Sequence, residues 1–266
     1  MKILILSNKD LASNFALNLL VPKLTADHEI HLWLSAKVGG NSNFPSQLNR
    51  LKFFEQDLFN KLLSPSFSGN NIGKLKGFEY FQCDLASELA EENSINSPET
   101  IERIKQLAPD LIVSIRYGGI LKEESINIPA KGVLNLHSGI LPLYRGVMAT
   151  FWAMLNGDSK IGTTLHTIDD GNIDTGEIIK ISTLEVHFNK SYLWHVLELY
   201  KQGVLDILDT ISSYTLHEQV LKSPQPKENS YFSFPTTEDL IAFEQQGLKL
   251  VDEQEFLRFI SENYLS

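Results

Sequence analysis

Apolar residues follow two alternating patterns along this chain, short dense runs and longer stretches with helical spacing. The run at 2–7 is typical of a strand buried on both faces of a parallel sheet, and the stretch at 11–24 places Leu11 and Phe15 on one side of a helix. A second strand pattern at 29–34 completes a β-α-β unit. The same patterns predict helices at 51–63, 99–107, 148–155 and 191–208, strands at 111–115, 132–136, 162–168 and 178–186, and loops at 39–46 and 64–71.

Because strand and helix patterns alternate through most of the chain, we expect an α/β fold of the Rossmann-like kind, with a central, mostly parallel sheet flanked by helices. The composition changes near Gln219, where a polar, proline-containing connector precedes a Tyr- and Phe-rich patch and two short helical segments. We place a boundary near residue 210, between a catalytic domain at 1–210 and a C-terminal segment at 211–266. The aromatic alternation at 231–234 predicts a small β-hairpin in that segment.

The composition is that of an ordinary globular protein, with 42% hydrophobic and 21% charged residues. The net charge is −10 and the basic residues are scattered, which disfavours a nucleic-acid partner, because such partners need a basic face. The N-terminal apolar run is too short for a signal sequence or a membrane span. The single cysteine, Cys83, excludes an intramolecular disulfide and a Cys/His zinc site. We therefore expect a cytoplasmic protein without a membrane, nucleic-acid or metal partner.

Asn135 and His137 lie two residues apart at the C-terminal end of the strand expected at 132–136. Alternate residues of a strand point to the same face, and open parallel sheets bind ligands beyond the C-terminal ends of their strands. The amide and a protonated imidazole can together stabilise the oxyanion of a tetrahedral intermediate. The alternative is a loop-capping asparagine beside a hydrogen-bonded core histidine.

An acidic, glycine-containing loop separates two expected strands and contains Asp169, Asp170 and Asp174. A carboxylate of this loop, placed beside His137, would favour the charged imidazole and relay a proton through water. An ordinary turn rich in Asp, Asn and Gly is the alternative. A calcium loop is disfavoured, because the twelve-residue pattern with its bidentate glutamate is absent.

Four stretches occur in a fixed order, LNLHS at 134–138, LPLYRG at 141–146, GTTLH at 162–166 and DGNIDTG at 170–176. Together they resemble the core of the formyltetrahydrofolate-dependent formyltransferases, a family that includes glycinamide ribonucleotide transformylase and methionyl-tRNA formyltransferase. With the N-terminal β-α-β unit, the resemblance covers well over half of the chain. It implies the formyltransferase fold, N10-formyltetrahydrofolate as co-substrate and no metal.

The resemblance maps the family's catalytic asparagine, histidine and aspartate onto Asn135, His137 and Asp174. Asp174 is chosen among the three carboxylates because a small residue and a glycine follow it, as in the family pattern. The implied reaction is attack of an unprotonated amine on the formyl carbon, with His137 and Asn135 stabilising the oxyanion. Asp174 would keep His137 charged and help carry the amine proton to the departing folate nitrogen.

In the family, a strand exit corresponding to 114–121 lines the pterin pocket, and the loop at 168–174 closes its other side. The resemblance implies that backbone groups make most of the folate contacts. The alternative is a plain strand exit in which Gly118 and Gly119 only serve the backbone geometry. The implied folate-binding residues are Arg116, Tyr117, Gly118, Ile120, Leu121 and Asp170.

The stretches at 141–152 and 229–236 resemble the nucleotide-sugar N-formyltransferases, which formylate an amino group of a dideoxy sugar carried by dTDP. The implied acceptor is a sugar such as dTDP-4-amino-4,6-dideoxyglucose, and the product would serve O-antigen or other surface-glycan synthesis. Two alternatives stay open: an enzyme like methionyl-tRNA formyltransferase that acts on another amine, and a non-catalytic folate or nucleotide binder. A nicotinamide-dependent oxidoreductase is disfavoured, because the turn at 7–10 lacks the Gly-x-Gly-x-x-Gly pattern.

The candidate contacts with the nucleotide sugar are Arg145, Lys76, Tyr231 and Phe232. An arginine can bind diphosphate and an aromatic ring can stack on a nucleobase. Arg145 can equally brace its loop through backbone carbonyls, and the aromatic residues can pack on the core or on a second subunit. Because exposed aromatic patches are often covered by a partner, we expect a homodimer formed through the C-terminal segment.

Overall fold

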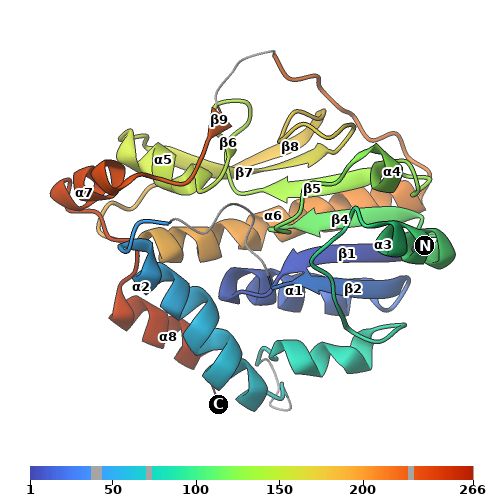
Figure 1. Cartoon of the computed structure of the whole chain (residues 1–266), viewed down its shortest axis with the longest axis horizontal. Coiled ribbons are helices and arrows are strands. Elements are labelled where there is room, and N and C mark those ends of the chain that lie inside the picture. The colour runs from blue at the N-terminus through green and yellow to red at the C-terminus, as the bar shows by residue number, and fades with distance from the viewer. Residues whose placement is uncertain (37–43, 70–73, 227–230, 266) are drawn as a thin grey trace.

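The computed structural model of the protein describes residues 1–36, 44–69, 74–226 and 231–265 (Figure 1). Parts of the loops expected at 39–46 and 64–71, and the first two residues of the 229–236 stretch, lie outside the described residues. None of the helices in the described ranges combines the length and apolar character needed to cross a bilayer.

A seven-stranded sheet forms the centre of the described part of the chain (Figure 1). Its strands are β1 (Lys2–Asn8), β2 (Glu29–Ser35), β3 (Ala90–Glu91), β4 (Leu111–Ile115), β5 (Val133–His137), β7 (Lys160–Thr167) and β8 (Ile178–Glu185). Their order is β3-β2-β1-β4-β5-β7-β8, in which the first five are parallel and the last two pair in antiparallel fashion. The predicted α/β fold with a mostly parallel central sheet is confirmed.

Helices cover both faces of this sheet, and alternate strand residues divide between them. Ile3 and Ile5 join the core beneath α1 (Leu11–Leu24) and α6 (Tyr192–Thr215), whereas Leu4 and Leu6 join a second core with residues of α3 (Pro98–Leu107) and α4 (Glu123–Ile126). A strand that is apolar on both faces needs this double cover. The other helices are α2 (Leu48–Lys52), η1 (Phe53–Leu63), η2 (Ser64–Ser66), η3 (Phe78–Asp84), α5 (Ala149–Leu155), α7 (Thr237–Gln245) and α8 (Glu253–Asn263).

The first helix begins where the sequence pattern predicts it, because Asp10 caps it. The Asp10 carboxylate accepts a hydrogen bond from the Ser13 N–H (2.8 Å), which satisfies one of the free donors of the first turn. The single helix expected at 51–63 instead begins earlier, as α2, and continues as the π-helix η1, which buries Glu55 and Phe59. Asp10 and Glu55 therefore both lie inside the protein near the end of β1.

In its described residues, 211–226 and 231–265, the C-terminal segment forms no β-hairpin. Its strand β9 (Tyr231–Phe232) pairs in parallel with β6 (Arg145–Gly146), which belongs to the LPLYRG stretch far away in the sequence. The residues that would form the return strand start α7 instead, because Thr236 and Asp239 close a capping box. In the described residues the aromatic strand thus pairs with a distant segment and not with a neighbouring strand of a hairpin.

The segment after residue 210 shares its core with the sheet. Helix α6 continues past the expected boundary to Thr215, and α7 and α8 bury Phe243 and Phe256 in the core that also contains α1. The Tyr264 hydroxyl donates to Asn14 Oδ1 on α1 (2.7 Å). The division at residue 210 stays a prediction from the sequence. The described residues of the segment pack on α1 and on the core beneath the sheet that carries the site.

Candidate active site

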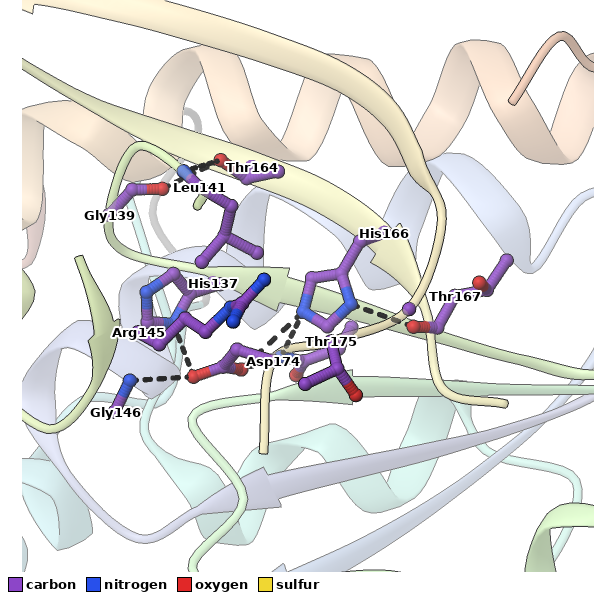
Figure 2. A network of polar contacts seen from close by, with 12 residues as sticks. His137, Gly139, Leu141, Arg145, Gly146, Thr164, His166, Thr167, Asp174 and Thr175 are labelled. Atoms are coloured by element: carbon purple, nitrogen blue, oxygen red, sulfur yellow. Dashed lines mark hydrogen bonds and ion pairs between the residues drawn. The ribbon is translucent and has the colours of Figure 1, made fainter. Parts of the chain in front are cut away.

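Asn135, His137 and Asp174 come together at the C-terminal end of β5, with His166 as a fourth member. Figure 2 shows Asp174 between His137 and His166. Asn135 and His137 leave the same face of β5, and His166 stands directly opposite Asn135 on the antiparallel strand β7. The loop after β7 then returns Asp174 to this point. Two neighbouring strand ends and one loop thus build a compact polar cluster.

Asp174 is the centre of this cluster. Its Oδ2 lies 3.5 Å from His137 Nδ1 and accepts the Gly146 N–H (2.9 Å), while its Oδ1 lies 3.5 Å from His166 Nε2. Burial raises the pKa of Asp174, but the charge of His137, the hydrogen bond and charge of His166 and the Gly146 N–H outweigh burial and lower the pKa to about 2. The carboxylate is therefore ionised throughout the physiological pH range.

His137 faces a hydrogen-bond acceptor on each side of its ring. Nε2 lies 2.7 Å from the Tyr144 carbonyl oxygen, and Nδ1 faces the Asp174 carboxylate. A carbonyl oxygen only accepts, so Nε2 donates to Tyr144, and Nδ1 is left to face the Asp174 carboxylate. Gly139 leaves room for this arrangement, because a Cβ there would lie 2.6 Å from His137 Nε2. The imidazole ring is thus held in one orientation by two acceptors.

His166 orients the Asn135 amide, a role that the sequence did not suggest. The Nδ1 of His166 lies 2.7 Å from the Thr167 carbonyl oxygen and donates to it, and its Nε2 lies 3.0 Å from Asn135 Nδ2 and 3.5 Å from Asp174 Oδ1. The Asn135 amide donates to Asp174 Oδ1 at 3.4 Å. The histidine was visible in the GTTLH stretch, but only the β5–β7 register shows what it contacts.

Two side chains predicted to bind folate instead hold the loop after β4 in place through contacts within the protein. Arg116 adopts a left-handed backbone (φ +56°), and its guanidinium donates to Asp10 (3.0 Å) and to Glu55 (3.3 Å). The Tyr117 hydroxyl donates to the Glu92 carbonyl (2.9 Å). Both side chains thus bind other parts of the protein. Their contact with folate remains a prediction.

The two expected walls of the pterin pocket approach each other. A Cβ on Gly171, in the acidic loop, would lie 3.8 Å from the Leu121 carbonyl oxygen. Leu121 itself is buried, Ile120 is 53% exposed, and Gly118 lies between Tyr117 and Ile120 in an irregular turn. Asp170 stabilises its own loop by accepting the backbone and side-chain N–H groups of Asn172, which lower its pKa. The two segments therefore lie side by side, and their contact with folate stays a prediction.

The buried carboxyl group of Glu55 should make folding stability depend on pH. Burial raises the pKa of Glu55 from 4.5 to about 7, although Arg116 acts in the opposite direction. The folded protein thus holds this proton more tightly than the unfolded chain, so the contribution is full below pH 4.5 and is lost as the pH rises to about 7.

We expect the unfolding free energy of the wild type to fall relative to that of Glu55→Gln over this pH range, by up to about 3 kcal/mol. Urea unfolding at several pH values measures the difference, with the exposed Glu218→Gln as the matched control. Parallel profiles for wild type and Glu55→Gln would contradict a proton held at Glu55.

The candidates for nucleotide-sugar contacts fall into two groups. Tyr231 is 54% exposed and its ring covers Gly146, where φ is +97° and a Cβ would meet the Phe232 carbonyl oxygen at 2.2 Å. Phe232 packs its ring against Tyr144 and Trp152, with centroid distances of 5.4 and 5.1 Å. The Gly146 N–H also binds the Asp174 carboxylate, so the exposed Tyr231 ring borders the polar cluster.

Arg145 and Lys76 make structural contacts. The Arg145 side chain is buried and donates to Gln225 Oε1 (3.1 Å) and to the Pro226 carbonyl (3.2 Å), as the bracing alternative expects. Lys76 pairs with Asp84 and lies over the Phe81 ring, beside α1. Arg145 lies next to the Asp174 cluster, whereas the partners of Lys76 lie outside it. Substrate binding by either residue remains a prediction.

Within the described ranges, no group of three or more His, Cys, Asp or Glu side chains is arranged to hold a metal ion. The chain matches the family model described as formyl transferase over residues 39–193, more than half of its length, and the match contains Asn135, His137 and Asp174. The chain belongs to the formyl transferase family. The resemblance found in the sequence is confirmed at this level.

Curated relatives with similar sequences are methionyl-tRNA formyltransferases. The protein of Clostridium novyi is 38% identical over 136 residues, which cover 47% of this chain and 43% of that protein. The protein of Francisella tularensis subsp. holarctica is 34% identical over 157 residues, 58% of this chain and 48% of that protein. The alignments thus span less than half of the length of these relatives.

Solved structures with the same fold include sugar N-formyltransferases. One from a Shewanella species has a TM-score of 0.59 at 16% identity and covers 92% of this chain and 87% of that chain. A 4-N formyltransferase from Francisella tularensis has a TM-score of 0.60 at 16% identity, with the same coverage. The N-formyltransferase from Helicobacter canadensis, in complex with folinic acid and dTDP-3-aminofucose, has a TM-score of 0.56 at 19% identity and covers 90% and 72%. These similarities confirm the formyltransferase fold.

Proposed function

We propose that this protein transfers the formyl group of N10-formyltetrahydrofolate to the amino group of a dTDP-linked amino-dideoxy sugar. The observation that carries the proposal is the ionised Asp174 carboxylate held against His137 and beside Asn135 at the end of β5, in a chain of the formyl transferase family. The product would serve O-antigen or other surface-glycan synthesis.

His137 and Asn135 stabilise the oxyanion in the proposed reaction. The acceptor amine adds to the formyl carbon, a carbon–nitrogen bond forms, and the carbonyl oxygen takes up the electron pair. In the protonated form that Asp174 is proposed to maintain, His137 places a positive charge beside this oxygen. Asn135 contributes its amide by exchanging the long 3.4 Å contact with Asp174 for the new oxygen, while His166 keeps the 3.0 Å contact that fixes the amide.

Asp174 serves the proton transfer. Addition leaves a proton on the attacking nitrogen, and collapse of the intermediate requires a proton on the departing N10 of the folate. With a pKa near 2, Asp174 is too weak a base to keep the proton, but it orients a water or the acceptor nitrogen for the transfer. The bond from the formyl carbon to N10 then breaks, which yields the formamide and tetrahydrofolate.

Three observations support a nucleotide-linked amino sugar as the acceptor. The fold similarity extends over 87% of the Shewanella sugar N-formyltransferase, whereas sequence similarity reaches less than half of the methionyl-tRNA relatives. The Helicobacter canadensis structure contains dTDP-3-aminofucose, and the exposed Tyr231 borders the cluster here. The net charge of −10 disfavours a tRNA surface. Sequence identity to the curated relatives supports methionyl-tRNA as the second candidate acceptor.

An acceptor panel tests this choice. The protein is mixed with N10-formyltetrahydrofolate and, in separate reactions, a dTDP-4-amino-dideoxyhexose, a dTDP-3-amino-dideoxyhexose and methionyl-tRNA, and tetrahydrofolate release is followed. We expect release with an amino sugar only. Release with methionyl-tRNA alone would replace the proposed acceptor by the second candidate.

We further propose that the segment 211–266 forms a homodimer interface. It carries the exposed apolar side chains Tyr231, Ile241 and Leu257. Size-exclusion chromatography with light scattering at micromolar concentration should give twice the mass of the chain. A monomer under these conditions would contradict the interface.

A further inference from the structure

The connector after α6 runs along the loop that carries Asp174. Ser223 and Ile178 exchange two backbone hydrogen bonds of 2.8 Å, which fixes the connector to the beginning of the edge strand β8. Pro226 is held by Arg145 through its carbonyl oxygen (3.2 Å). Between these two attachments lies Gln225, a residue in none of the motifs that identify the family.

Both ends of the Gln225 amide are engaged. Its Nε2 donates to the Asp174 carbonyl oxygen (3.1 Å) and to the Gly176 carbonyl oxygen (2.6 Å). Its Oε1 accepts from Arg145 Nη2 (3.1 Å). An amide nitrogen has two hydrogens, so this side chain places both of its donors on the backbone of the Asp174 loop.

Asp174 needs such support because its backbone is left-handed, with φ +54°. A residue with a Cβ occupies this region at an energetic cost, and it stays there only when its surroundings hold it. Strand β6 holds it from one side: Gly146 binds the carboxylate directly, and Arg145 binds Gln225, which binds the carbonyl oxygen. The connector thus links the backbone of the Asp174 loop to β6, the strand whose Gly146 N–H binds the carboxylate.

We propose that Gln225 is a positioning residue that keeps the Asp174 carboxylate against His137. The inference rests on the proposed function, because it assigns Gln225 an effect on the reaction through Asp174. It also gives the C-terminal segment a part in catalysis, since the connector completes the catalytic loop.

Gln225→Glu separates the two ends of this side chain. A carboxylate still accepts from Arg145, now as an ion pair, so the connector stays docked. It has no hydrogen to donate and repels the carbonyl oxygens of Asp174 and Gly176.

We expect kcat of Gln225→Glu to fall about 10- to 100-fold, because the acid–base group is displaced but still present. The KM values for both substrates should change less than about 3-fold. Gln219→Glu, an exposed position of the same connector, is the matched control.

A double-variant cycle then tests whether the effect passes through Asp174. In an Asp174→Asn background, Gln225→Glu should lower kcat less than about 3-fold further, because residues that act as a unit are not additive. Thermal unfolding confirms that each variant is folded at the assay temperature, and Gln225→Met, which removes both donors without adding charge, replaces the glutamate if it is not.

A kcat for Gln225→Glu equal to that of Gln219→Glu, or a full multiplicative loss in the double variant, would overturn the positioning role while the proposed function stands. Wild-type kcat in Asp174→Asn itself would overturn the role of Asp174 and this inference with it.

Discussion

Replacing His137 with alanine should lower kcat about 10³-fold, equivalent to about 4 kcal/mol of transition-state stabilisation. In the proposed reaction the protonated imidazole, paired with Asp174, places a positive charge beside the formyl oxygen. In His137→Ala the Asn135 amide alone is left to stabilise the oxyanion, and the Asp174 carboxylate loses the imidazole that faces it. The rate of tetrahydrofolate formation at saturating donor and acceptor measures the effect.

The matched control is His217→Asn, since His217 is exposed and has a φ of +56° that asparagine also adopts readily. This variant should retain the wild-type rate. If His137→Ala also keeps most of its kcat while it remains folded, His137 does not stabilise the oxyanion.

Replacing Asp174 with asparagine should lower kcat about 10³-fold with little change in KM, because the charge that favours the imidazolium and orients the proton is lost while the side-chain shape is kept. The Asn Oδ1 can still accept the Gly146 N–H, so the loop should keep its place. Steady-state kinetics with both substrates varied separates the two parameters. Asp209→Asn, at an exposed position of α6, is the control and should behave as wild type.

Asp174→Asn should also change how the free energy of unfolding depends on pH in acid. The lowered pKa of Asp174 means that the ionised carboxylate stabilises the fold above pH 3.8, and that this contribution is lost as the pH falls to about 2. It corresponds to about 2 kcal/mol. Asp174→Asn should lack this part of the acid-induced loss, which unfolding curves between pH 5 and pH 2 reveal. An unchanged acid profile together with wild-type kcat would contradict the paired carboxylate.

The parts of the site that follow from local rules were predictable from the sequence. Asn135 and His137 lie together because alternate residues of any strand share a face, and the dense apolar run before them predicted the strand. The capped start of α1 at Asp10 follows from one side chain and one turn. Asp174 was selected by its place in a motif, and the structure sets it beside His137.

The remaining features depend on pairings between distant segments. His166 contacts Asn135 only because β7 runs antiparallel to β5 in one register, which no local pattern specifies. Arg116 turns toward Asp10 and Glu55 because its backbone is left-handed, and the π-helix that supplies Glu55 was predicted as an ordinary helix. Tyr231 and Phe232 pair with the LPLYRG stretch, and Gln225 reaches the catalytic loop from a connector. Side-chain direction at these positions is decided by the tertiary fold.

Formyl transfer itself can be followed with N10-formyltetrahydrofolate that carries ¹³C in the formyl group. The labelled donor and a dTDP-amino-dideoxy sugar are incubated with wild-type protein or with His137→Ala, and the products are read by NMR and mass spectrometry. We expect the label in a formamide on the sugar nitrogen with the wild type, at a rate about 10³-fold lower with the variant. Label that stays on the folate, or that leaves as free formate while the sugar amine is unchanged, would contradict a formyltransferase acting on this acceptor.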